Sequence, residues 1–214
     1  MNILDWIYPP KCVFCHRLME TSKTLICEDC RRDVPRTARS GLQKVPFVPI
    51  CVAPYYYEKD VKESLHRFKL FGCTGYAKVY APAVAEVIRA EIAAFDVLTW
   101  VPISRKRMRK RGYDQAQLLA KEVGKLIGVR PLRTLKKIRH TPPQSQTGGA
   151  EKRKANIAGA YAAVHPERFA GKRVLILDDI LTTGATVSEC ARILGRAGAE
   201  RVYCATVARS RSGG

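Results

Sequence analysis

The sequence lacks any apolar run long enough to cross a bilayer, which takes about 18 residues or more. Its first fifteen residues carry Asp5 and two prolines where a signal peptide has an apolar core, so we expect no signal peptide. Acidic residues are scarce as well, because 19 Asp and Glu stand against 38 Lys and Arg, for a net charge of +19. We therefore expect a cytoplasmic protein with anionic partners, such as phosphates, nucleic acid or an acidic lipid surface.

Disulfides are not expected in the cytosol, where thiols stay reduced, so the eight cysteines need another explanation. Four of them form two Cys-x2-Cys pairs separated by eleven residues: Cys12, Cys15, Cys27 and Cys30. Thiolates at this spacing can surround one tetrahedral ion. We predict a structural zinc site in a knuckle spanning residues 1–38, which is too short to fold without the metal. A pair of disulfides, or thiols packed in a small core, is the alternative.

The most informative stretch, residues 174–186, reads Val-Leu-Ile-Leu-Asp-Asp-Ile-Leu-Thr-Thr-Gly-Ala-Thr. Its apolar run predicts a strand buried on both faces, as in a parallel sheet, and we expect Asp178 and Asp179 to end it. A loop of small residues then opens a helix, whose first N–H groups can bind an anion. Gly184 lets the chain approach a phosphate closely, and the threonine hydroxyls can donate to it. The segment predicts a sugar-phosphate site, and an ordinary buried strand with a capped helix is the alternative.

The rest of the chain alternates strand and helix patterns, which predicts an α/β fold with a parallel sheet flanked by helices. Residues 39–50 are expected to link the knuckle to a body that spans residues 51–214. Strands are expected at 51–57, 97–101, 132–138, 160–164 and 201–207, and helices at 60–71, 76–95 and 114–127.

Two polar stretches are candidates for binding. Residues 103–115 follow a predicted strand and contain six cations, and open α/β sheets bind ligands at such carboxyl ends. For Lys106, Arg107 and Lys110, however, we favour a solvated charge run. Residues 139–158 form a long polar loop that we interpret as a mobile lid. Because residues 101–154 hold 16 Lys and Arg but three acidic residues, this region suits a pyrophosphate or a nucleic-acid backbone equally.

Residues 174–186 closely resemble the motif with which type I phosphoribosyltransferases bind phosphoribosyl pyrophosphate (PRPP). The whole chain is similar to the ComF family, whose members include the competence protein ComFC and the GntX-like proteins. The blocks that carry this resemblance are His-Arg-Phe-Lys at 66–69, Val-Pro-Ile-Ser at 101–104, Arg-Lys-Arg-Gly-Tyr-Asp-Gln-Ala at 109–116, Arg-His-Thr-Pro-Pro-Gln at 139–144 and Lys-Arg-Lys-Ala-Asn at 152–156. The resemblance implies a phosphoribosyltransferase-like fold and a role in natural transformation or the use of extracellular DNA.

The resemblance also implies roles for single residues. Asp178 and Asp179 would hold the ribose and, in an enzyme, be the catalytic pair. The 5-phosphate would be held by Thr182, Thr183, Gly184, Ala185 and Thr186. Ser104, Arg105 and Lys69 would contact the pyrophosphate, which Mg2+ accompanies. Pocket-lining or covering residues would be Arg111, Gln115, Gln144, Arg153 and Asn156. Position 114 is Asp where the family commonly has Asn.

Two functions remain open at this point. The protein could transfer ribose 5-phosphate from PRPP to a base or nucleotide-type acceptor, with release of pyrophosphate. It could instead bind PRPP without chemistry and support DNA uptake, with single-stranded DNA or a DNA-uptake helicase as its partner, and this is the interpretation that we favour. In the basic stretch Tyr113 is the one aromatic residue, so a platform for stacking bases is not evident. The sequence names neither the acceptor nor the oligomeric state.

Overall fold

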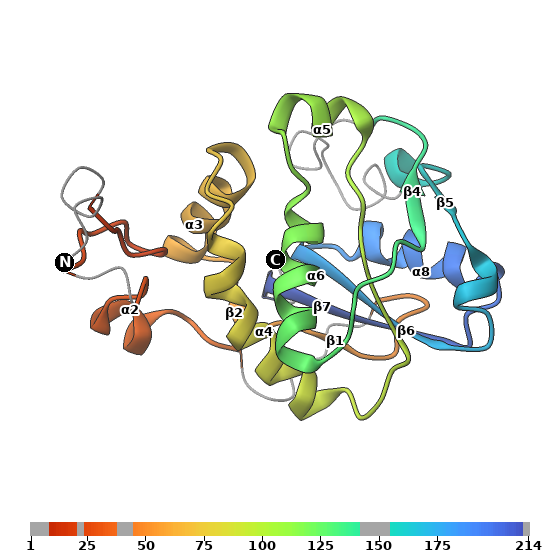
Figure 1. Cartoon of the computed structure of the whole chain (residues 1–214), viewed down its shortest axis with the longest axis horizontal. Helices are drawn as coiled ribbons and strands as arrows, with labels where there is room; N and C mark the ends of the chain where they lie inside the picture. The colour runs from red at the N-terminus through yellow and green to blue at the C-terminus, as the bar shows by residue number, and fades with distance from the viewer. Residues whose placement is uncertain (1–8, 21–23, 38–44, 142–154, 212–214) are drawn as a thin grey trace.

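The computed structural model describes residues 9–20, 24–37, 45–141 and 155–211 (Figure 1). A parallel sheet of five strands forms the centre of the body, in the order β1-β7-β6-β3, with β2 also beside β7. The strands are β1 (Cys51–Val52), β2 (Tyr55–Tyr56), β3 (Val97–Trp100), β6 (Arg173–Leu181) and β7 (Arg201–Arg209). The predicted buried strand is thus confirmed as β6, between β3 and β7. It does not end at the acidic pair, as we expected, but continues to Leu181.

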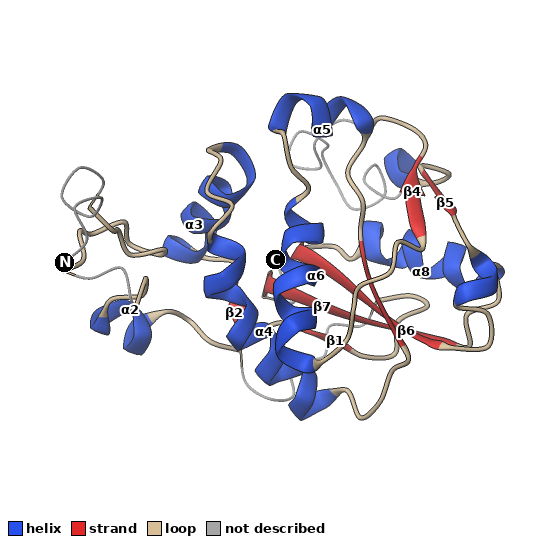
Figure 2. Cartoon of the chain, viewed as in Figure 1, coloured by secondary structure: helices blue, strands red, loops and turns tan. Residues whose placement is uncertain are grey.

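Helices cover both faces of this sheet (Figure 2). Helices α4 (Tyr76–Glu91) and α6 (Gln115–Ile127) pack on one face, and α8 (Ala185–Arg196) packs on the other. Four residues of α8 at helical spacing are buried: Val187, Cys190, Ala191 and Leu194. The fold class predicted from the sequence is therefore confirmed.

Two segments differ from the expectation for physical reasons. The basic stretch, expected as a loop, contains α5 (Arg105–Arg111). Ser104 caps this helix by accepting a hydrogen bond from the backbone N–H of Arg107, and Gly112 ends it with a φ of 80°. The strand expected over residues 51–57 is divided into β1 and β2 around Pro54, because proline has no N–H to donate to a ladder.

Two short strands flank the predicted lid in the sequence and form a separate antiparallel pair. They are β4 (Leu135–Lys137), which precedes the lid, and β5 (Tyr161–Ala163), which follows it. A short 3-10 helix, η2 (Pro166–Arg168), then connects β5 to β6. Residues 142–154, most of the predicted lid, lie outside the described residues. The lid therefore stays a prediction.

The amino-terminal unit holds α2 (Glu28–Asp33) and an isolated bridge between Lys11 and Leu18. Its residues Val13 and Phe14 are buried in the same apolar cluster as residues of α3 (Lys59–Leu70) and α4. The predicted boundaries of the knuckle and the linker stay predictions, because residues 38–44 lie outside the described part. Over the ranges that the structure describes, no helix is both long and apolar enough to pass through a membrane.

Candidate functional site

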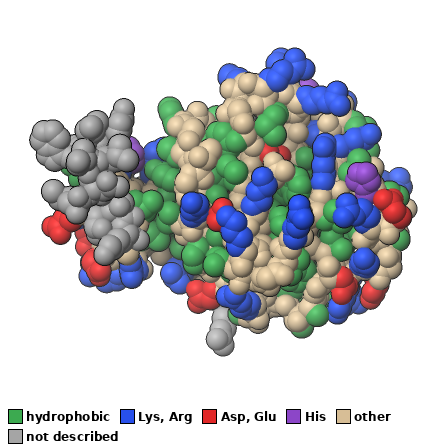
Figure 3. All heavy atoms as spheres, viewed as in Figure 1, with side chains coloured by type: hydrophobic (Ala, Val, Ile, Leu, Met, Phe, Trp, Pro, Cys, Tyr) green, Lys and Arg blue, Asp and Glu red, His purple; other side chains and the backbone are tan. Residues whose placement is uncertain are grey.

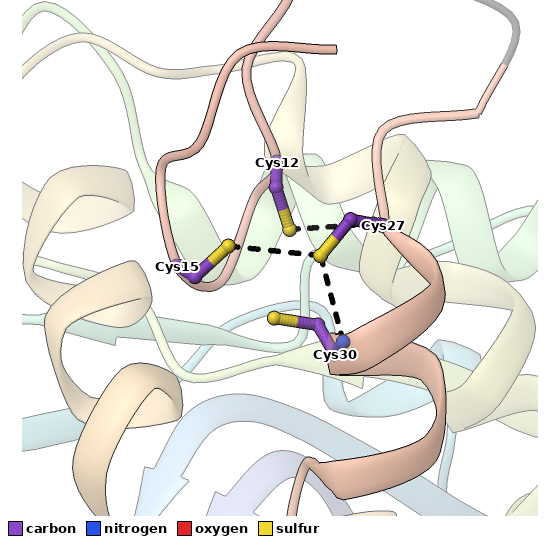
Figure 4. A group of neighbouring side chains, drawn as sticks. All are labelled: Cys12, Cys15, Cys27 and Cys30. Carbon is purple, nitrogen blue, oxygen red and sulfur yellow. Dashed lines mark hydrogen bonds between the residues drawn. The ribbon is translucent and has the colours of Figure 1, made fainter.

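The four cysteines of the two Cys-x2-Cys pairs converge on one point (Figure 4). Their Sγ atoms all lie within 4.8 Å of one another, and those of Cys15 and Cys27 are 3.6 Å apart. Zinc–sulfur bonds of about 2.3 Å in a tetrahedron put sulfurs about 3.8 Å apart, so the cluster fits that ion. All eight cysteines are free thiols, which contradicts the disulfide alternative.

Backbone N–H groups already support thiolates in this cluster. Cys27 N lies 3.4 Å from the Sγ of Cys12, and Cys30 N lies 3.5 Å from the Sγ of Cys27. Burial raises the pKa of the Cys12 thiol, but backbone hydrogen bonds from Cys27, Cys15 and Phe14, together with the Cys15 side chain, outweigh it and lower that pKa to about 7. The donor set therefore fits a closed structural zinc site.

The second candidate site surrounds Asp178 and Asp179 near the carboxyl end of β6. Consecutive residues of a strand point to opposite faces of the sheet, and the two carboxylates have different neighbours accordingly. Asp179 is 3% exposed and faces α3, where Lys69 Nζ lies 3.0 Å from its Oδ2. This contact is an ion pair, and no well-aligned hydrogen bond from the described residues reaches that oxygen. The oxygen can therefore still accept a hydrogen bond from a ligand hydroxyl.

Asp178 lies on the other face, where its charge acts on Lys137 and Cys190. Burial, and then the charge of Asp179, raises the pKa of the Asp178 carboxyl well above its usual range, while Lys69 opposes the shift. The pair therefore repels additional negative charge and favours bound hydroxyl donors or cations.

Arg107 is a site residue that the sequence analysis assigned wrongly. We expected it in a solvated charge run, but it is half-buried and its Nη2 donates to the Thr141 carbonyl over 3.0 Å. Burial and the charge of Arg111 lower the pKa of its guanidinium, whereas the charge of Asp179 opposes this. Arg105, which the resemblance assigned to the pyrophosphate, is exposed. Had α5 been predicted as a helix, its spacing would have placed residues 107 and 111 on one face. The difference between the half-buried Arg107 and the exposed Arg105 could then have been found.

Lys137 and Tyr161, on β4 and β5, were missed altogether. Lys137 Nζ donates to the Tyr161 hydroxyl over 3.2 Å. Burial and the charge of Arg107 lower the pKa of Lys137 to about 8, while Asp178 opposes the shift. The available signal was strand alternation, because Lys137 lies two residues after the buried Leu135 and shares its face.

Several predicted residues have side-chain partners in the structure. Ser104 Oγ lies 2.9 Å from His140 Nδ1, and Arg111 donates to the side chain of Gln115. The Asp114 carboxylate accepts from the N–H groups of Ile103, Ala116 and Gln117, so this departure from the family pattern caps α6.

Two buried polar atoms on either side of residues 142–154 of the sequence, Thr141 Oγ1 and Asn156 Nδ2, find no hydrogen-bond partner within the described ranges. Buried polar groups are nearly always paired in folded proteins, so both atoms are candidates for contact with a ligand. Gln144 and Arg153, the other predicted lid residues, lie outside the described part of the chain.

The predicted phosphate loop, Thr182 to Thr186, leads into α8. Gly184 is the N-cap residue with a φ of 73°, and Thr183 Oγ1 accepts from Ala185 N over 3.5 Å. A Cβ at position 184 would lie 2.9 Å from a methyl carbon of Val45. Backbone conformation and this close packing thus require glycine, independently of the phosphate contact that we predicted.

Comparisons with known proteins agree with this architecture. Residues 109–214 match the phosphoribosyl transferase domain, and residues 3–41 match the double zinc ribbon domain. Competence protein F of Haemophilus influenzae is 24% identical over 223 residues, covering 94% of this chain and 97% of the relative. DNA utilization protein YhgH of Escherichia coli is 29% identical over 206 residues, covering 90% of this chain and 88% of the relative.

Among solved structures, the glutamine PRPP amidotransferase from B. subtilis is 22% identical with a TM-score of 0.43, covering 61% of this chain and 26% of that one. The sheet, its helices and the matching domain models define the class: a phosphoribosyltransferase-like body with a zinc-ribbon unit before it. Relatives that match along nearly the whole chain make the assignment narrower: they support a ComF-family protein, as the sequence blocks predicted.

Proposed function

We propose that this protein binds PRPP together with Mg2+ at the carboxyl end of β6, and that it serves the uptake or use of DNA in the cytoplasm. The observation that carries the proposal is the pair Asp178 and Asp179 just before the loop that opens α8, with Lys69 in an ion pair with Asp179 and Arg107 within reach of the Asp179 charge. Carboxylates that accept from ribose hydroxyls, cations for a pyrophosphate and a helix start for a phosphate are the groups that PRPP needs.

In this proposal each group has one role. Asp178 and Asp179 accept hydrogen bonds from the ribose hydroxyls, and residues 182–186 hold the 5-phosphate. Lys69 turns from Asp179 to the pyrophosphate, so the ligand exchanges one ion pair for another. Arg107 reaches the pyrophosphate from α5 and takes the role that the resemblance implied for Arg105. Thr141 and Asn156 lie where the lid segment begins and ends, and their unpaired atoms would contact the ligand when the lid covers it.

The part in DNA uptake rests on charge and on the relatives. One relative is named a competence protein and another a DNA utilization protein. Arg105, Lys106, Arg109 and Lys110 of α5 are exposed, and lysine and arginine side chains gather over this end of the molecule (Figure 3). We propose single-stranded DNA or a DNA-uptake helicase as the partner of this basic surface.

Calorimetry with PRPP and Mg2+ tests the ligand. We expect binding heat for the zinc-loaded protein and its loss in Asp178→Ala/Asp179→Ala. Glu122→Gln is a matched control, since this carboxylate pairs with the exposed Lys125 of its own helix, α6. No binding to the unaltered protein, or equal binding to the double variant, would contradict the proposal.

Binding of a labelled single-stranded oligonucleotide at several salt concentrations tests the partner. Arg109→Ala/Lys110→Ala should weaken binding and lower the slope of log K against log salt by up to about 1.4, or about 0.7 for each lost phosphate contact. Lys78→Ala, an exposed cation on α4, should leave the slope unchanged. A flat salt dependence of the unaltered protein would exclude a direct contact with nucleic acid and favour the helicase.

A transferase is the second candidate, and the placement of two cations beside the acidic pair favours it. In that case the pair stabilises positive charge at the anomeric carbon, and Lys69 and Arg107 stabilise the leaving pyrophosphate. Transfer of labelled ribose 5-phosphate to a base or nucleotide, lost in the double-alanine variant, would establish it. If no acceptor in a broad panel is turned over, PRPP binding without transfer remains as the function.

A further inference from the structure

Helix α3 contacts the metal centre with one side and the sugar-phosphate site with the other. Val13 and Phe14 are the two spacer residues between the metal-binding residues Cys12 and Cys15. Ser64 Oγ donates to the carbonyl of Val13. Arg67 Nη2 donates to the same carbonyl over 3.0 Å and also to that of Phe14. Both spacer carbonyls of the metal-binding loop are therefore held by α3.

Aromatic packing fixes this contact. The Phe14 ring meets that of Tyr55 edge-on, with centroids 5.3 Å apart, and lies 6.2 Å from that of Tyr80. Ser64 gives its one proton to Val13, so the Tyr80 hydroxyl donates to Ser64. The exposed fraction is 0% for Val13 and 2% for Phe14. The metal-binding loop is thus part of the core on which α3 rests.

The last turn of α3 makes the second contact. Lys69, two residues after Arg67, lies about 3 Å further along the helix and about 200° around it, and its Nζ contacts Asp179. Phe68, between them, is fully buried, and its carbonyl accepts from the Tyr113 hydroxyl. Because one rigid turn carries both contacts, a shift of the loop at Arg67 displaces Lys69 as well.

We infer that Ser64 and Arg67 are positioning residues that couple the four-cysteine metal centre to the sugar-phosphate site through Lys69. This inference rests on the proposed function. The metal fixes the loop between Cys12 and Cys15, and the loop carbonyls fix the register of α3. Lys69 then stands at the distance from the acidic pair at which it can serve a pyrophosphate. Coupling between two binding events is reciprocal. Bound PRPP must therefore raise the affinity for the metal by the same factor by which the metal raises the affinity for PRPP.

The extent of zinc transfer at equilibrium from the loaded protein to a chromogenic chelator, with and without saturating PRPP and Mg2+, tests this coupling. We expect PRPP to lower the equilibrium constant of this transfer about 5-fold or more, within the usual range of couplings between sites. The factor should fall to about one in Arg67→Ala with zinc still bound, and Arg67→Lys should restore part of it. Arg89→Ala is the matched control, because Arg89 also donates to a backbone carbonyl, that of Leu126, but lies on α4.

Calorimetry on the same proteins separates the possible results. Arg67→Ala with zinc bound should bind PRPP more weakly by about the factor lost from zinc retention, while its circular dichroism stays that of the unaltered protein. PRPP that binds the unaltered protein but leaves zinc transfer unchanged overturns the coupling and leaves the proposed function standing. An equal effect of Arg67→Ala and Arg89→Ala would also overturn it. Absence of PRPP binding overturns the proposed function and the coupling together.

Discussion

The ion pair between Lys69 and Asp179 makes a quantitative prediction. Two unit charges 3.0 Å apart attract by about 5 kcal/mol at an effective dielectric constant of about 20, and desolvation offsets much of this. Lys69→Met leaves the Asp179 carboxylate, whose side chain is 5% exposed, without its counter-charge. We expect a loss of about 3 kcal/mol in the free energy of unfolding, measured by urea denaturation of the zinc-loaded protein at neutral pH.

A second variant distinguishes charge from packing. Lys69→Met/Asp179→Asn removes both charges at similar volume, so it should recover about 2 kcal/mol relative to Lys69→Met alone. Lys125→Met is the control, since Lys125 lies 2.8 Å from Glu122 but is 67% exposed, and it should cost less than about 0.5 kcal/mol. A cost of Lys69→Met no greater than that of the control, or a double variant no more stable than the single one, would refute the reasoning.

Three further predictions follow from other features. Burial and the charge of Arg107 lower the pKa of Lys137 to about 8, and the protonated amine suits a bound polyanion. PRPP affinity should therefore fall as the pH rises through about 8. Calorimetry from pH 7 to 9 should show this fall, and Lys137→Met should abolish it. The unfolded chain keeps that proton until about pH 10.4, so the free energy of unfolding should rise with pH between those values, less steeply in the variant. Gly184→Ala combines a φ of 73° with a clash against Val45 and should cost about 1–3 kcal/mol in thermal or urea unfolding; Val45→Ala should relieve only the clash. Removal of zinc by a chelator should lower the melting temperature measured by circular dichroism and expose the apolar surface around Phe14 to a fluorescent dye, whereas an unchanged melting curve would contradict a structural metal.

The parts that the sequence predicted well depend on strong local patterns. The four cysteines have the spacing of a metal site, and the structure brings their sulfurs together. The strand at 174–177 is apolar at every position, which identifies a central strand of a parallel sheet. Helix α6 begins at a capping residue, Asp114, and ends before Gly128, whose backbone is left-handed.

The parts that could not be predicted depend on contacts between distant segments. Helix α5 carries seven residues with six cations, and periodicity says little about so short and polar a helix. The half-buried Arg107 is fixed by Thr141, 34 residues away in the chain, and the pairing of Lys69 with Asp179 spans a still longer separation. The reason for a glycine at 184 is likewise partly the side chain of Val45, which no local pattern reveals.

The burial of Phe14 against Tyr55 and Tyr80 also bears on how the polypeptide matures on the ribosome. Those rings belong to an apolar cluster that extends to Ala208 on the last strand. The cysteine-rich segment therefore emerges from the exit tunnel long before the surface that covers it has been translated. Early binding of the ion would keep this segment compact until the rest of the cluster has been translated. Metal supply would therefore govern the yield of newly made protein as well as the stability of the folded protein.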